Sequence, residues 1–396
     1  MPGVLMGMLT SATLVAQDSY YKADPQFHPA PEASAARYQI IRFGPVGIGL
    51  ELRQPAFTMY VTGVEEGSPA AACGQFKKGQ IIESVNGVTL KDIDPRIILG
   101  NMITEAEAKD GIMKMMVKDD VKTAAREVVV KIPALGAYSD TWPLNCPKSD
   151  KIVRNFADFL SKEESVDLGI QGSMLFMLST GEEKDLEVVR GWIKKLVAKN
   201  KNVEEINTYP WFAGYSGPAL CEYYLRTGDK SILPVIKKIA DCLTRTIYNG
   251  SWAGRGAAPY QYMAGGHMNA AGVHCVTFLM LAKECGVDVD EHTLQSSLKY
   301  FYRFSGRGNV AYGDGVPEGG YTDNGRTTGL ALAMAAAASL SPDGENSVYA
   351  KARDISATKG FYATSWLFHG HTGGGIGELW RGQSMGLVKD KRPSQY

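Results

Sequence analysis

The sequence predicts a multidomain α+β protein, with a small β-rich domain followed by a larger all-α domain. Strand-like alternation and tight turns extend over residues 37–135, and helical patterns fill residues 148–396. The chain has 396 residues, and a single core commonly serves roughly 100 to 200. We therefore expect two domains, joined by a linker at 136–147 and preceded by another at 18–36.

The charge balance excludes one class of partner. Lys plus Arg number 42, and Asp plus Glu also number 42. No net field attracts a polyanion, so we expect no nucleic acid partner. No stretch offers about 20 uninterrupted apolar residues, so no membrane span is predicted either.

Residues 1–17 resemble a secretory signal. An apolar run ends in small residues near Ala16, although the usual basic residue near the start is missing. This pattern predicts a periplasmic or extracellular protein. The alternative is an unstructured start on a cytoplasmic protein.

The six cysteines show no spacing typical of a metal site or a redox motif. Cys221 and Cys242 lie at unequal distances from the turn near Gly228, too far apart along two helical arms for a disulfide. We expect buried free thiols.

The first domain carries an ordered series of motifs. A strand over residues 38–43 leads to Gly47-Ile48-Gly49-Leu50, and a second strand leads to a turn beginning Glu65-Glu66-Gly67. A third strand ends in Asn86-Gly87, a pair that tolerates the positive φ of a tight turn. Pro95 opens a helix that runs to about Lys109, and two closing strands follow.

This succession resembles the PDZ family as found in bacterial proteases and exported proteins, with a small β-sandwich or barrel and helices. The resemblance implies that the C-terminus of a peptide or protein pairs beside the glycine-loop strand, with loop amides holding its carboxylate. The residues that match this role, or are placed to assist it, are Arg42, Gly47, Ile48, Gly49, Leu50, Ile97 and Ile98. The alternative is that the domain only packs against its neighbour.

A pattern of apolar helix, turn and amphipathic helix recurs in the second domain. Five segments begin it: 169–174, 214–219, 269–274, 325–330 and 370–375. Helices that are apolar on every face alternate with amphipathic helices, which expose one polar face to solvent. The pattern resembles the α/α toroid of terpene cyclases and several polysaccharide-active enzymes. Five starts are fewer than the six of a closed ring, so the toroid is predicted to be open or incomplete. The two domains together also resemble an uncharacterised bacterial family with a domain of unknown function.

Unusual polar residues concentrate in the loops that enter the apolar helices. Asp323 and Glu378 are the candidate acid and base, with His267 and Tyr321 as further candidates. Trp and Tyr stack on sugar faces, so carbohydrate is a candidate ligand. The residues predicted to line a polar, aromatic cavity are Tyr262, Asn269, Arg326, Trp366, His369, His371 and Trp380.

A metal site is a weaker interpretation of the same loops. His267, His369 and His371, with Asp323, are the only ligand candidates, and no fixed fourth ligand is evident. No cofactor is therefore predicted, with zinc as the exception to test. Three functions stay open: an exported peptide-binding protein with a ligand cavity, a glycosidase or polysaccharide lyase targeted by its first domain, and a non-catalytic scaffold.

Overall fold

A computed structural model describes residues 37–53, 57–90, 95–169, 171–254, 266–306, 310–313, 325–362 and 376–389; the side chains of residues 37, 38, 95–97, 362 and 376–378 are not described. The chain divides into two compact units, Met1–Ile152 and Val153–Tyr396. We call them the N-terminal unit and the helical unit.

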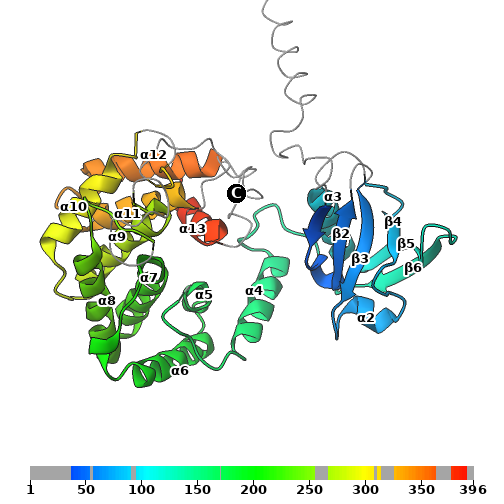
Figure 1. Cartoon of the computed structure of the whole chain (residues 1–396), viewed down its shortest axis with the longest axis horizontal. Helices are drawn as coiled ribbons and strands as arrows, with labels where there is room; N and C mark the ends of the chain where they lie inside the picture. The colour runs from blue at the N-terminus through cyan, green and yellow to red at the C-terminus, as the bar shows by residue number, and fades with distance from the viewer. Residues whose placement is uncertain are drawn as a thin grey trace, which may run out of the picture. The chain divides into compact units, whose positions relative to one another are not determined.

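The N-terminal unit is a six-stranded antiparallel sheet whose strands are ordered along the chain (Figure 1). The strands are β1 (Arg37–Ile40), β2 (Ile48–Arg53), β3 (Thr58–Val64), β4 (Ile81–Val85), β5 (Ile112–Lys118) and β6 (Arg126–Lys131). Short 3-10 helix η1 (Gly44–Val46) and helices α2 (Pro69–Cys73) and α3 (Pro95–Glu107) complete the unit. The strands and helices predicted from the sequence are thus confirmed.

Alternation along these strands builds the core. In β2, buried Ile48, Leu50 and Leu52 alternate with less buried residues, because successive side chains of a strand point to opposite faces. Helix α2 begins after Ser68, whose hydroxyl accepts a hydrogen bond from the Ala71 amide at 3.1 Å. Ser68 is thus the N-cap of α2, and Pro69 is its first residue.

The helical unit contains successive helical hairpins, and α4 (Pro147–Leu160) spans the boundary before them. Helices α5 (Gly172–Ser179), α7 (Pro210–Thr227), α9 (Asn269–Glu284) and α11 (Arg326–Leu340) pack one against the next. Each is followed by a partner: α6 (Glu183–Lys199), α8 (Leu233–Thr246), α10 (Glu291–Tyr302) and α12 (Val348–Tyr362). The 3-10 helices η2 (Val203–Glu205), η3 (Lys230–Ile232) and η5 (Gly344–Asn346) lie in the connections, and α13 (Ile376–Met385) comes last.

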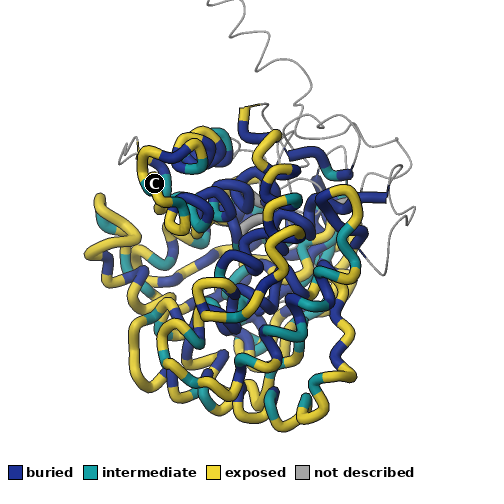
Figure 2. The backbone as a smooth tube through the Cα atoms, turned by 90° about the vertical axis from the view of Figure 1, so that its left-hand side faces the viewer, coloured by how far each residue is buried: buried dark blue, intermediate teal, exposed yellow. Residues whose placement is uncertain are grey.

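The two sets of helices differ in how far their residues are buried. Most residues of α7, α9 and α11 are buried, whereas α6, α8 and α10 expose a charged face. Figure 2 shows the buried residues gathered in the interior of this unit and the exposed ones outside. This agrees with the predicted pairing of apolar and amphipathic helices.

One predicted helix start is wrong. Residues 214–219 were expected to lead into a helix, but they lie inside α7, which begins at Pro210. A Cβ on Gly214 would lie 2.9 Å from the His274 Cβ, and one on Gly217 would lie 2.2 Å from Phe278 Cδ2. These glycines therefore allow close packing of α7 on α9 and do not mark a loop.

The last helix, α13, contacts several of the apolar helices. Its Trp380 ring contacts Tyr215 of α7 and His274 of α9, and Leu379 lies against Gly172 of α5. Helix α13 also packs against α11 and α12.

All six cysteines are free thiols, as expected, and five of them are buried. Within the described part of the chain, no helix is long and apolar enough to cross a membrane.

Candidate functional site

The glycine loop of the N-terminal unit has the close backbone approach that its sequence predicted. Gly47 ends η1 with a φ of 78°, in the left-handed region that favours glycine. A Cβ at this position would lie 2.1 Å from the Ser68 Cβ, so no larger residue fits. The Gly47 carbonyl accepts a hydrogen bond from the Glu65 amide at 2.9 Å, which holds the loop against the end of β3.

The strand edge expected to receive a peptide is already paired. Strand β2 has β3 on one side and β1 on the other, and β1 runs antiparallel to it with Ile40 opposite Leu50 and Arg37 opposite Arg53. Ile40 is partly buried and packs on the same core as Ile98. The chain's own segment thus lies along β2 as a ligand strand would lie.

Arg42 and Ile97 are two further residues that were predicted to contact a peptide. Arg42 forms an ion pair with Glu65, so its guanidinium already has a carboxylate partner. The neighbouring Ile41 is 90% exposed and takes no part in the core. Ile97 belongs to α3, but its side chain lies outside the described residues.

Four of the residues singled out in the helical unit have described side chains. They are His267, Asn269, Arg326 and Trp380, and all are at most 4% exposed. The others lie outside the described residues: Tyr262, Tyr321, Asp323, Trp366, His369 and His371, together with the side chain of Glu378. The proposed acid–base pair therefore remains a prediction.

His267 and Asn269 hold loops together. The His267 Nε2 lies 2.6 Å from the Tyr248 carbonyl oxygen, which can only accept, so Nε2 carries the proton. Nδ1 then accepts from the Tyr300 hydroxyl at 3.2 Å. To bind a metal, His267 would have to give up one of these contacts. The Asn269 amide nitrogen donates to the Gly313 carbonyl at 2.7 Å.

The buried polar side chains at the centre of the unit form an aromatic cluster. The Trp380 ring stacks on His274 at 4.1 Å between centroids, and Tyr215 meets both rings edge-on. Among the described residues, neither His274 ring nitrogen has a hydrogen-bond partner, and burial lowers the pKa of His274 to about 3. Arg326 lies over the Tyr312 ring at 5.0 Å. Within the described residues, Trp380, His274 and Tyr215 thus pack against one another.

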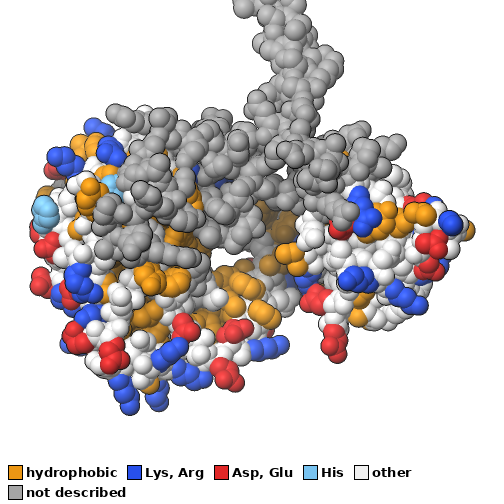
Figure 3. Space-filling view, in the orientation of Figure 1, with side chains coloured by type: hydrophobic (Ala, Val, Ile, Leu, Met, Phe, Trp, Pro, Cys, Tyr) orange, Lys and Arg blue, Asp and Glu red, His pale blue; other side chains and the backbone are white. Residues whose placement is uncertain are grey.

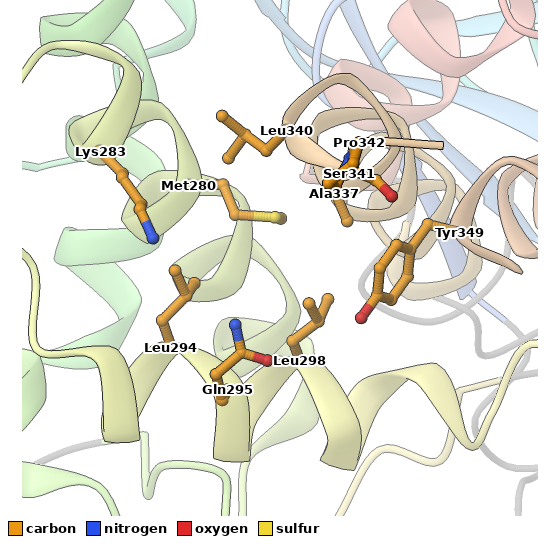
Figure 4. Close-up of a pocket in the computed structure, with 10 residues that line it drawn as sticks. All are labelled: Met280, Lys283, Leu294, Gln295, Leu298, Ala337, Leu340, Ser341, Pro342 and Tyr349. Carbon is orange, nitrogen blue, oxygen red and sulfur yellow. The ribbon is translucent and has the colours of Figure 1, made fainter. Parts of the chain in front are cut away.

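Two hollows open on the described surface of the helical unit. The first, of about 240 Å³, is lined by residues of α9, α10 and α11 and by Ser341, Pro342 and Tyr349 (Figure 4). Its polar groups are engaged, because Lys283 pairs with Glu291 at 2.8 Å and Gln295 donates to the same carboxylate. No free charge remains there to orient a ligand.

The second hollow is a groove of about 450 Å³ between α5, α7 and α13. Leu175, Phe176 and Leu379 provide apolar walls, and Glu222 and Arg226 of α7 are its charged residues. Sequence reasoning missed this site, because Glu222 looks like any polar residue of a helix and nothing local marks a groove. We call it the α5–α7–α13 groove.

Metal ligands do not gather in the described part of the molecule. No three His, Cys, Asp or Glu side chains among the described residues lie close enough to hold a metal ion. The candidates His369 and His371 lie outside these residues.

A sheet with a glycine loop, followed by paired apolar and amphipathic helices, defines a two-part protein. A PDZ domain model matches residues 60–97, which cover most of β3, all of α2 and β4, and the start of α3. The model "Domain of unknown function (DUF6288)" matches residues 149–396, and the chain belongs to that family. No curated protein and no solved structure matches the chain.

Proposed function

We propose that the N-terminal unit binds the C-terminal segment of a peptide or protein along β2, in exchange for its own strand β1. PDZ domains generally bind such segments by adding a strand to a sheet edge. The observation that carries the proposal is the antiparallel pairing of Arg37–Ile40 with β2, from Ile40 opposite Leu50 to Arg37 opposite Arg53. An internal strand in this place acts as a competing ligand.

The competition is expected to be reversible because β1 is held weakly. It is four residues long, and its neighbour Ile41 is 90% exposed. Of the two residues of β1 whose side chains are described, Gln39 is exposed and Ile40 is partly buried against the core. Partial burial of one Ile side chain contributes about 1 to 2 kcal/mol, which corresponds to roughly tenfold in an equilibrium constant.

The substitution Ile40→Asp therefore tests the proposal in the full chain. A charged residue disfavours docking of β1, so we expect about tenfold tighter binding of a fluorescent peptide with a free C-terminal Val or Leu, measured by anisotropy. The same peptide with an amidated C-terminus should bind more weakly than the free acid, because the loop amides then lose the carboxylate.

The matched control is Ile41→Asp, which places the same charge one residue further on, at an exposed position. It should bind the peptide as the unsubstituted protein does. Retained sheet content by circular dichroism shows that Ile40→Asp still folds. Equal affinity of the two variants, or no difference between the acid and the amide, would contradict strand exchange.

A further inference from the structure

The C-terminal halves of α7 and α9 bring two cysteines together. Cys221 lies in α7, and Cys285 follows the last residue of α9. The Cys285 sulfur lies 3.7 Å from the Cys221 carbonyl oxygen, although the two residues are 64 positions apart along the chain. The thiols also interact with each other, since burial, and then the hydrogen bond with Cys285, raise the pKa of the Cys221 thiol. In the structure both residues are free thiols.

The close approach of the two helices explains why these side chains meet. Gly214, Gly217 and Cys221 lie at positions i, i+3 and i+7, on one face of α7. The two glycines lack the Cβ atoms that would hold α7 away from α9. Gly217 lies against Phe278, and Cys221, one turn further along α7, lies against Cys285. A disulfide needs Cβ atoms roughly 3.5 to 4.5 Å apart, so a close helix approach of this kind is what a cross-link requires.

Two other buried cysteines of the helical unit have different neighbours. Cys275 also lies in α9, and its thiol donates to the Pro210 carbonyl at 3.2 Å. The Cys242 thiol donates to the Ile206 carbonyl at 3.5 Å. A main-chain carbonyl cannot be oxidised together with a thiol. These two cysteines therefore serve as an internal comparison for the pair Cys221 and Cys285.

The two sulfurs lie beneath the surface at different depths. Figure 3 shows charged side chains on the outer surface of the helical unit, whereas Cys221 is 0% and Cys285 is 4% exposed. Cys285 is followed by Gly286, an exposed residue in the turn after α9. A reagent from solution therefore reaches the Cys285 sulfur before the Cys221 sulfur.

We infer that Cys221 and Cys285 are a redox-active pair that forms a disulfide with a small-molecule disulfide, such as oxidised glutathione, as the oxidant. The Cys285 thiolate attacks one sulfur of the oxidant, whose S–S bond breaks, so one glutathione leaves and a mixed disulfide remains. Cys221 then loses its proton and attacks the Cys285 sulfur, which releases the second glutathione. Two protein thiols are oxidised, and the oxidant is reduced to two thiols that take up both protons. This inference does not depend on peptide binding by the N-terminal unit.

The cross-link is expected to fix α7 to α9 and to stabilise the helical unit. A disulfide acts mainly by restricting the unfolded chain, and its effect grows with the length of the loop that it closes. The two cysteines enclose a long loop, since they are 64 positions apart. The cross-linked protein should therefore unfold at a temperature roughly 10 °C higher than the reduced protein.

The test uses the full chain, either reduced with dithiothreitol or refolded from denaturant in oxidised glutathione. Refolding in the oxidant ensures that burial of the thiols does not limit the reaction. After alkylation and digestion, mass spectrometry should detect a peptide pair linked through Cys221 and Cys285 in the oxidised sample alone. Thermal unfolding followed by circular dichroism should show the higher transition temperature in the same sample.

Three variants make the result specific. Cys221→Ala and Cys285→Ala should each lose both the linked peptide and the rise in unfolding temperature. The matched control Cys275→Ala removes a buried thiol of α9 and should keep both, when its oxidised and reduced forms are compared. The linked peptide is detected in the unsubstituted chain, so this measurement holds even where a variant folds poorly.

Three outcomes would overturn the proposal. One is an oxidised sample without the Cys221–Cys285 peptide. Another is linkage of Cys221 to other cysteines as often as to Cys285. The third is an unfolding temperature that rises on oxidation as much in Cys285→Ala as in the unsubstituted protein.

Discussion

Replacing Trp380 by Ala is expected to destabilise the helical unit by about 4 kcal/mol, the usual loss for a fully buried Trp. The side chain is 1% exposed and stacks on His274 while meeting Tyr215 edge-on. Since α13 contacts α5, α7, α9 and α11, the resulting cavity would weaken several helix contacts together. Chemical unfolding followed by circular dichroism at a helical wavelength measures the loss.

Two variants make the Trp380 result specific. Trp142→Ala removes a Trp that is 47% exposed in the linker, and it should change the free energy of unfolding by less than about 0.5 kcal/mol. Trp380→Phe keeps an aromatic ring and should recover part of the loss. A loss below about 1 kcal/mol for Trp380→Ala would mean that α13 is not packed as described.

Acidification is expected to weaken the helical unit through His274. Its pKa in the folded protein is about 3, because burial disfavours the charged ring, whereas an exposed His titrates near 6.5. Well above pH 6.5 the ring is neutral in both the folded and the unfolded state, so the lowered pKa does not change the free energy of unfolding. As pH falls below 6.5, His274 binds a proton in the unfolded state but stays neutral in the folded state. From about pH 7.5 to about pH 5 this costs about 2 kcal/mol of unfolding free energy.

The variant His274→Leu isolates this effect, because Leu has no charge to gain. Any packing energy that this substitution removes is the same at pH 7.5 and at pH 5. Over this pH range the free energy of unfolding of the variant should therefore fall by about 2 kcal/mol less than that of the unsubstituted protein. The control His292→Leu changes an exposed residue in the first turn of α10, and its free energy of unfolding should vary with pH as in the unsubstituted protein. If the free energy of unfolding varied with pH equally in His274→Leu and in the unsubstituted protein, this role for His274 would be ruled out.

The local patterns of the sequence predicted much of the fold. Pro95 predicted the start of α3, and the alternation over residues 38–43 predicted the first strand, which is β1 (Arg37–Ile40). Nearly continuous apolar helices predicted the interior of the second unit. These features depend on neighbours within a few residues, so the sequence carries them directly.

The glycines of α7 show where local reasoning fails. Gly214 and Gly217 are typical of a loop when read along the chain, yet they are the contact points of α7 with His274 and Phe278 of α9. The partner lies about 60 residues away, and no pattern within α7 indicates it. Likewise, the interpretation of His267 as an acid, base or ligand could not anticipate its contacts with Tyr248 and Tyr300.

By itself the sequence determined the two-unit organisation, the order of strands and helices and the unpaired state of the cysteines, because periodicity, caps and spacing act over short distances. Only the tertiary structure decided that β1 covers the edge of β2 and that Trp380 of α13 packs against Tyr215 of α7 and His274 of α9. Each of these depends on which distant segments meet, and that is set by how the whole core packs.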